Sequence, residues 1–320
     1  MEVNRRAKMK YMDKLKTEIG KVISGKDLEI ELMAISLIFN GHILLESVPG
    51  TGKTMLAKAF ARTINGDFSR IQFTPDVLPS DVTGIRFFNP KNQEFEFHPG
   101  PIISNVVLAD EINRAAPRTQ SSLLEVMEER QVTIDGHTIR LDPPFMVIAT
   151  QNPAETQQGT FPLPVAQLDR FFMKLKMDYP SREEEKAMLQ MYRSGAAPSE
   201  VNAIFILDQI INLKKDAGKI ILNEPVEAYL LDIVRKTREH ADIELGVSPR
   251  GMLALMKASQ GKALMEGRNY VIPNDIKEMV PFVLGHRIFL STEASMTKSP
   301  ESVLKEVLES VPVPVESGAL

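Results

Sequence analysis

Short apolar runs alternate with longer amphipathic stretches through the first half of the chain. Runs that are apolar at consecutive positions are typical of strands buried on both faces of a parallel sheet, with helices packed on each side. The runs expected to form strands are HILLES at 42–47, SRIQF at 69–73, NVVLA at 105–109, FMVIAT at 145–150 and FFMKLKM at 171–177.

Helices and two hairpins fill the segments between these runs. A 3.6-residue apolar period predicts helices at 27–39, 53–65 and 118–130. Residues 85–97 predict a small hairpin, because two apolar strands flank the turn-forming NPKNQ. Residues 131–141 predict another, since Asp135–Gly136 between alternating segments is a strong signal for a tight turn.

The pattern changes near Pro180, after which helical periods dominate. Ser181 is expected to cap a helix whose first turn is acidic. Further helices are predicted at 200–216, 224–239, 248–266, 273–284 and from Ser299 onward, several with proline at their start, and VPVPV at 311–315 is expected to be extended. The sequence therefore predicts an α/β domain at 1–178 and an all-α domain at 179–320.

Composition narrows the function classes. The chain has 320 residues, and at roughly 150 residues per domain two domains are expected. Lysine and arginine total 38 against 42 aspartate and glutamate residues, and this net charge of −4 argues against nucleic acid as the main partner. Cysteine is absent, which excludes disulfides and thiolate chemistry, and the five histidines have no ligand spacing that would indicate a transition metal.

The charged N-terminus lacks the apolar core of a signal peptide, and no apolar stretch is long enough to span a bilayer. We therefore expect a cytoplasmic protein without membrane insertion.

The segment SVPGTGKT at 47–54 carries the first chemical signal. It leaves a predicted strand and enters a predicted helix, so its backbone amides and the helix N-terminus can hold phosphate oxygens. Lys53 would neutralise the β- and γ-phosphates, and the Thr54 hydroxyl would coordinate Mg²⁺. Ser47 stands where the phosphate-loop pattern has its first glycine, which is harmless unless that position needs a positive φ angle. The alternative interpretation is an incidental glycine-rich turn.

The segment NVVLADEIN at 105–113 supplies two acids at the end of an apolar strand. Ligands of open α/β sheets bind at the carboxyl ends of the strands, so Asp110 is expected to hold Mg²⁺ through water. Glu111 could polarise an attacking water as general base. The alternative is an acidic pair that caps the next helix.

Three further polar residues are candidates for sensing a γ-phosphate. Asn152 directly follows a predicted strand and could orient the lytic water, although it also suits a turn before a proline. Arg170 precedes the last predicted strand, and Arg250 begins a helix of the second domain. An arginine fork stabilises charge spread over phosphate oxygens, and the alternatives are a solvated Asp169–Arg170 pair and a surface arginine.

Taken together, these segments resemble the MoxR family of AAA+ ATPases. The similarity runs in order from about residue 22 to 290 and includes VVLADEINRAAPRTQSSLLEVMEERQVTIDG, LPVAQLDRFFMKL and GVSPRGMLALMKASQGKAL. Two positions differ from the family pattern, namely Ser47 and Val165, where a glutamate is expected.

The resemblance implies a role for each candidate residue. Lys53 and Thr54 would belong to the Walker A motif, and Asp110 and Glu111 to the Walker B motif. Asn152 would be sensor 1, Arg170 would be the arginine finger, and Arg250 would be sensor 2. It also implies that both predicted hairpins are the helix-2 and pre-sensor-1 insertions. The residues expected to bind nucleotide are Val22, Ile23 and Gly25 at the adenine, together with Pro49, Gly50, Thr51, Gly52, Lys53, Thr54 and Met55 in and after the phosphate loop.

The expected function is that of a Mg²⁺-dependent ATPase that forms a ring, expected to be a hexamer, and remodels other proteins. The resemblance implies a client protein with a von Willebrand factor A domain. Two alternatives stay open: a nucleic-acid motor, and a module that holds ATP as a conformational switch with little turnover.

Overall fold

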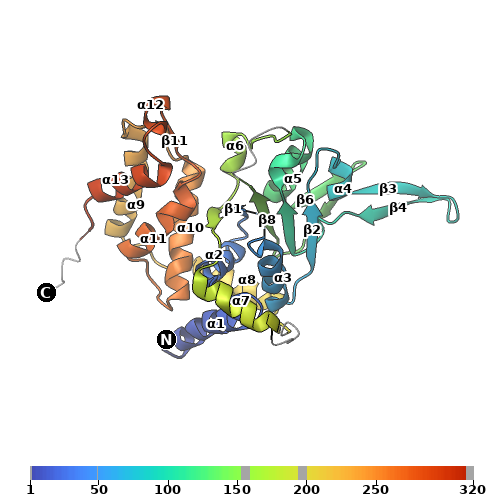
Figure 1. Ribbon diagram of the computed structural model, residues 1–320, viewed down its shortest axis with the longest axis horizontal. Coiled ribbons are helices and arrows are strands. Elements are labelled where there is room, and N and C mark those ends of the chain that lie inside the picture. The colour runs from blue at the N-terminus through green and yellow to red at the C-terminus, as the bar shows by residue number, and fades with distance from the viewer. Residues whose placement is uncertain (1, 49, 153–158, 194–199, 315–320) are drawn as a thin grey trace. The chain divides into compact units, whose positions relative to one another are not determined.

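The computed structural model describes residues 2–48, 50–152, 159–193 and 200–314, and Figure 1 shows their helices and strands. Contacts divide the chain into two compact units. We call the first the sheet unit, which consists of Asp13–Phe171 and Leu175–Ile211. The second, the helical unit, consists of Met1–Met12, Phe172–Lys174 and Asn212–Leu320. Helix α1 (Glu2–Gly20), which the sequence did not predict, contributes residues to both.

A five-stranded sheet forms the centre of the sheet unit, as predicted. Its order is β2-β5-β8-β1-β9, and the pairs β1–β8, β5–β8 and β2–β5 are parallel. All five predicted runs form these strands within two residues of their expected bounds. The strands are β1 (Ile43–Ser47), β2 (Phe68–Gln72), β5 (Val106–Asp110), β8 (Met146–Gln151) and β9 (Met173–Met177).

The central strands β1, β5 and β8 are buried on both faces. Alternate residues of a strand point to opposite faces, and Leu44, Val107 and Val147 share one apolar cluster with Leu123 and Met127 of helix α5 (Pro117–Glu129). Helix α3 (Lys53–Thr63) contacts β2 and β5 and buries an apolar stripe of its own. Because water is excluded from both faces of these central strands, only their ends remain available for polar chemistry.

Other predicted elements of the sheet unit are also present. Helix α2 (Asp27–Ile38) precedes β1, and helix α7 (Arg182–Arg193) begins after Ser181, whose hydroxyl accepts from the Glu184 amide. Both predicted hairpins are present: β3 (Gly84–Asn89) pairs with β4 (Glu94–Pro99), and β6 (Gln131–Ile134) pairs with β7 (His137–Arg140). The β3–β4 hairpin extends away from the sheet (Figure 1). The sequence did not predict the short α4 (Pro79–Thr83), η1 (Ile112–Arg114) and α6 (Val165–Leu168).

Helices dominate the second unit, in agreement with the prediction. They are α8 (Leu207–Ala217), which begins later than expected and is shared with the sheet unit, α9 (Glu224–Glu239), α10 (Pro249–Met265), α11 (Pro273–Leu284), α12 (Thr292–Ser295) and α13 (Pro300–Ser310). Two short strands, β10 (Ile243–Leu245) and β11 (Phe289–Leu290), pair antiparallel, so this unit is not wholly helical. Of the segment expected to be extended, only 311–314 lies within the described residues.

The contact-based division also differs from the predicted boundary at residue 178. Helix α7 belongs to the sheet unit, and the amides of Ile204 and Phe205 donate to the Thr63 carbonyl at 2.7 and 3.0 Å. These backbone bonds tie the chain to the end of α3 well beyond the last strand. Among the described residues, no helix is both long and apolar enough to cross a membrane.

A buried histidine joins three elements of the sheet unit. His42, just before β1, accepts from the Val147 amide of β8 at 2.9 Å through Nδ1, and its Nε2 lies 3.0 Å from the Met127 carbonyl of α5. The ring therefore carries its proton on Nε2. Burial, opposed by the Met127 bond and reinforced by Arg130, lowers the pKa of His42 from 6.5 to about 4. Folding thus favours the neutral imidazole.

This histidine should make stability depend on pH. Above pH 6.5 both the folded and unfolded chains hold a neutral ring, so the stabilisation is complete; below it, only the unfolded chain takes up the proton. At roughly 1.4 kcal/mol per pH unit, the shift from 6.5 to about 4 removes about 3 kcal/mol by pH 4. Urea unfolding gives the free energy of unfolding of each protein. The value for the wild type minus the value for His42→Gln should decrease as the pH falls, because only the wild type has the titrating ring.

Glutamine can supply one acceptor to Val147 and one donor to Met127 without titrating in this range. His137→Gln, at an exposed position of β7, should follow the wild-type pH dependence. Parallel pH profiles for His42→Gln and the wild type would contradict the assignment.

Candidate nucleotide-binding and hydrolysis site

The loop between β1 and α3 is shaped by two glycines. Gly50 and Gly52 have φ angles of 83° and 84°, in the left-handed region that side chains disfavour. Gly52 is the N-cap of α3, so the first free amides of this helix open toward the loop. Thr51 stiffens the turn, because its hydroxyl donates to the Val48 carbonyl at 3.2 Å. Such a loop at a helix N-terminus is suited to bind phosphate.

Ser47 causes no backbone strain at the start of this loop. It is the last residue of β1 and is absent from the non-glycine residues with positive φ among those described. A serine would be costly here only if the position needed a positive φ angle, and it does not. Its buried hydroxyl oxygen has no hydrogen-bond partner among the described residues. Pro49, which was expected to contact phosphate, lies outside the described residues.

Asp110 is surrounded by donors at the end of β5. The Thr150 hydroxyl of β8 donates to its Oδ1 at 2.6 Å, and Arg70 of β2 donates to its Oδ2 at 2.6 Å. The Lys53 ammonium lies 3.9 Å from Oδ1. The structure thus brings together the lysine expected at the phosphates and the acid expected to hold Mg²⁺.

Glu111 sits in an unusual backbone conformation beside this cluster. Its φ and ψ angles of 59° and 48° are left-handed, which a residue with a side chain adopts at a cost of order 1–3 kcal/mol. Its amide donates to the Thr150 hydroxyl at 2.9 Å, and its carboxylate accepts from Gln72 at 2.8 Å. Arg114 forms an ion pair with the same carboxylate at 3.2 Å. These partners fix the strained turn and aim the carboxylate.

Sequence reasoning missed Arg70, Gln72, Arg114 and Thr150, which hold the two acids. A signal was available in the strand SRIQF, where Arg70 and Gln72 alternate with buried Ile71 and so must share one face. What the sequence could not provide is the strand order, which places β2 directly beside β5.

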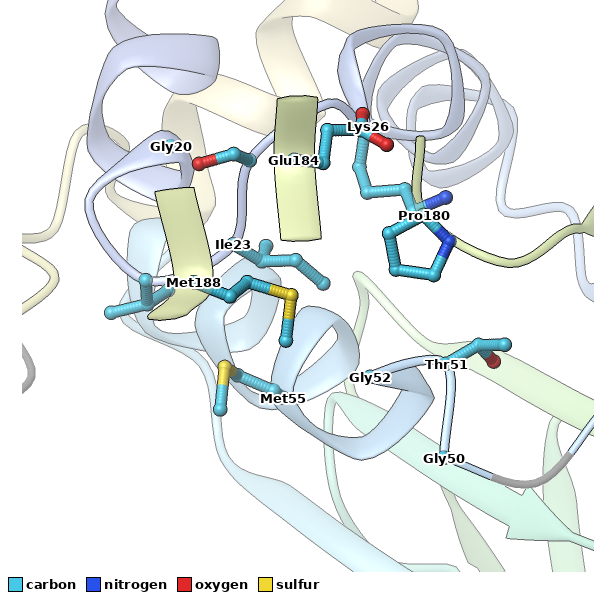
Figure 2. A pocket seen from close by; sticks show the side chains of 12 residues that line it. Gly20, Ile23, Lys26, Gly50, Thr51, Gly52, Met55, Pro180, Glu184 and Met188 are labelled. Carbon is cyan, nitrogen blue, oxygen red and sulfur yellow. The ribbon is translucent and has the colours of Figure 1, made fainter. Parts of the chain in front are cut away.

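A pocket of about 220 Å³ lies next to the phosphate loop, lined partly by loop residues Gly50, Thr51 and Gly52 (Figure 2). Its walls are mainly apolar, with Lys26 and Glu184 as the charged groups. The remaining lining residues are Gly20, Val22, Ile23, Ser24, Met55, Pro180 and Met188. Val22, Ile23 and Met55 were expected at a bound nucleotide, whereas the contribution of α7 through Glu184 and Met188 was not.

Gly25 stands directly behind this lining. Its φ angle is 74°, and the Glu184 carboxylate occupies the space that a side-chain carbon at residue 25 would take. Glu184 also accepts from the Ser181 amide at 2.6 Å, so the same carboxylate fixes the first turn of α7. Gly25 therefore shapes the pocket indirectly, by giving room to the residue that lines it.

The three candidate sensors occupy different places. Asn152 is buried immediately after β8, one residue beyond the strand. Arg170 donates from Nη1 to the Leu124 carbonyl of α5 at 2.7 Å, which anchors one edge of its guanidinium. Arg250 is exposed in the first turn of α10, where Ser248 caps the helix by accepting from the Gly251 amide. The helical unit holds Arg250, and the sheet unit holds the other two.

One histidine does approach acids, in the helical unit. Ligand atoms of His240, Asp242 and Glu306 lie within 4.8 Å of one another. Lys298, however, donates to Asp242 at 2.8 Å and to Glu306 at 2.9 Å. An ammonium group already balances these carboxylates, so the cluster is explained as an ion-pair network.

Comparison with known proteins places this geometry in a family. Residues 42–173 match the ATPase family associated with various cellular activities (AAA), and residues 235–307 match the AAA lid domain. The chain is 49% identical over 304 residues to the uncharacterized protein YeaC of Bacillus subtilis, covering 94% of each chain. It is 41% identical over 307 residues to the chaperone MoxR1 of Mycobacterium tuberculosis, covering 93% of this chain and 81% of that protein.

The chain belongs to the MoxR family of AAA+ ATPases. A crystal structure of a presumed ATPase from Cytophaga hutchinsonii is similar over 98% of both chains, with a TM-score of 0.90 and 37% identity. The expected architecture, an AAA+ sheet domain followed by a helical lid, is therefore confirmed for this MoxR-family chain. The AAA match ends inside β9, so α7 and its contribution to the pocket lie beyond the matched segment.

Gly25→Ala should weaken the binding of a fluorescent ATP analogue by about tenfold, because it adds strain and displaces the Glu184 carboxylate from the pocket wall. Gly20→Ala is the matched control, since a carbon added there meets no atom within 4 Å although Gly20 lines the same pocket. Equal affinities for the two variants would show that the contact behind the pocket is unimportant.

Proposed function

We propose that this MoxR-family protein binds ATP with Mg²⁺ and hydrolyses it at the carboxyl edge of the sheet. The observation that carries the proposal is the convergence of Lys53 with Asp110 and Glu111, at 3.9 Å for the lysine–aspartate pair. A phosphate loop, an acid pair and an apolar pocket adjoin one another in one compact unit. That combination fits a nucleoside triphosphate better than a small anion.

The residues present also fit the metal. Asp110 and Thr54 offer oxygen donors, which Mg²⁺ prefers, and its coordination through water and phosphate needs few protein ligands. Bound Mg²⁺ would neutralise charge that develops on the phosphates. In our proposal Lys53 binds the β- and γ-phosphates, Glu111 takes a proton from the attacking water, and Asn152 orients that water.

We further propose that hydrolysis takes place between subunits of a ring, with a hexamer as the expected size. Arg170 would act as the finger that reaches a neighbour's γ-phosphate, and Arg250 as a sensor from the lid. Anchoring of Arg170 by the Leu124 carbonyl leaves further guanidinium donors for a phosphate and limits the freedom of the side chain.

The work of the motor is proposed to be the remodelling of a client protein. The name chaperone for MoxR1 supports this role, and the family resemblance favours a client with a von Willebrand factor A domain. The net charge of −4 argues against nucleic acid as the alternative partner. Ser47 was the departure from the phosphate-loop pattern that favoured an ATP-binding switch with little turnover. Because Ser47 causes no strain in the phosphate loop, it gives that alternative no support.

A mixing experiment tests hydrolysis at subunit interfaces. Lys53→Ala should lose nucleotide binding, whereas Arg170→Ala should bind ATP but hydrolyse it about 10³-fold or more slowly. In mixed rings, a sound site needs an intact loop from one variant and an intact finger from the other. Equal amounts should combine these at about one interface in four, so phosphate release should recover to about a quarter of the wild-type rate.

The double variant Lys53→Ala/Arg170→Ala mixed with Lys53→Ala is the control, because no interface then has an intact loop. Native mass spectrometry must show that mixed rings form. If such rings stay as inactive as their components, Arg170 does not act across an interface, and the ring mechanism is wrong.

A further inference from the structure

Arg70 is the second cationic side chain at Asp110, and the proposed hydrolysis does not use it. It lies on β2, the strand next to β5 in the sheet. Its Nη2 donates to Asp110 Oδ2 at 2.6 Å. Its side chain is 46% exposed, compared with 8% for Asp110. The arginine therefore reaches from solvent onto a nearly buried carboxylate.

Protein groups contact both carboxylate oxygens of Asp110. Oδ1 accepts from Thr150 and faces the Lys53 ammonium, while Oδ2 is taken by Arg70. A buried carboxylate needs such a counter-charge, because charge without a partner is costly in a protein interior. A divalent cation beside the same carboxylate would be repelled by the guanidinium, because both charges are positive.

The same guanidinium is linked to Glu111. Arg70 Nη2 also donates to Gln72 Oε1 at 2.6 Å, and Gln72 Nε2 donates to Glu111 Oε2 at 2.8 Å. A continuous chain of hydrogen bonds thus runs from one acid to the other along the exposed end of β2. Movement of Arg70 would remove the partner that orients the Gln72 amide.

We infer that Arg70 is a positioning residue that holds Asp110 and competes with Mg²⁺ for it. The inference rests on the proposed Mg²⁺–ATP site. Its exposed guanidinium can turn toward solvent when the cation arrives, whereas Thr150, which is fully buried, stays in place. Arg70 thereby sets the concentration of Mg²⁺ at which the site is filled, and its release frees Gln72 from one of its two bonds.

Metal affinity measured without turnover tests this inference. Mn²⁺ binding is followed by electron paramagnetic resonance, with the full chain saturated by the non-hydrolysable ATP analogue AMP-PNP. Arg70→Gln and Arg70→Met remove the charge and should lower the Mn²⁺ concentration for half-saturation by about tenfold. Arg70→Lys keeps the charge and should stay within about threefold of the wild type.

The matched control is Arg62→Gln, an exposed arginine in the last turn of α3. It removes the same charge from the same unit and should leave Mn²⁺ binding unchanged. A general effect of net charge would move both positions equally and would overturn the inference.

Two results would contradict the competition. Either an unchanged Mn²⁺ requirement in Arg70→Gln and Arg70→Met, or a higher one, would show that Arg70 is neutral toward the metal or supports it. If the wild type itself binds neither AMP-PNP nor Mn²⁺, the proposed function is wrong, and this inference, which rests on it, is wrong as well. That failure is distinct, because it appears before any variant is compared.

Discussion

The arrangement of the acid pair depends on two hydrogen bonds made by the Thr150 hydroxyl group. It donates to Asp110 Oδ1 at 2.6 Å and accepts from the Glu111 amide at 2.9 Å, at a position with no exposure to solvent. A single side chain thus holds the last residue of β5 and the strained residue that follows it. The left-handed turn at Glu111 persists because this bond and the side-chain partners of the glutamate offset its cost.

Sheet order explains why these partners meet. Strand β5 lies between β2 and β8, so Gln72 and Thr150 approach the acids from opposite sides. Strand β1 lies on the far side of β8 and delivers the phosphate loop to the same edge, where Lys53 reaches Asp110. Since both faces of the central strands β1, β5 and β8 are buried, their polar side chains gather at this edge. The chemistry of the site follows from the topology.

Much of this could be predicted from the sequence, and the reasons are specific. Consecutive apolar residues located the strands, and the glycines with Lys53 located the loop, because both signals are local. The hydrogen-bond partners of Asp110 were missed, since Arg70 and Thr150 are each 40 positions away and meet it only through strand pairing. The wall of the pocket formed by α7 was missed for a similar reason: Glu184 resembles a solvated helix start until its contact with Gly25 is known.

The role of Glu111 can be tested most directly by separating binding from turnover. In Glu111→Gln, the account predicts ATP affinity within about threefold of the wild type and phosphate release at least about 100-fold slower, because only the proton acceptor is lost. Glu309→Gln, at an exposed position near the end of α13, should retain both properties. Phosphate release by Glu111→Gln at the wild-type rate would contradict the claim that this acid pair is the centre of hydrolysis.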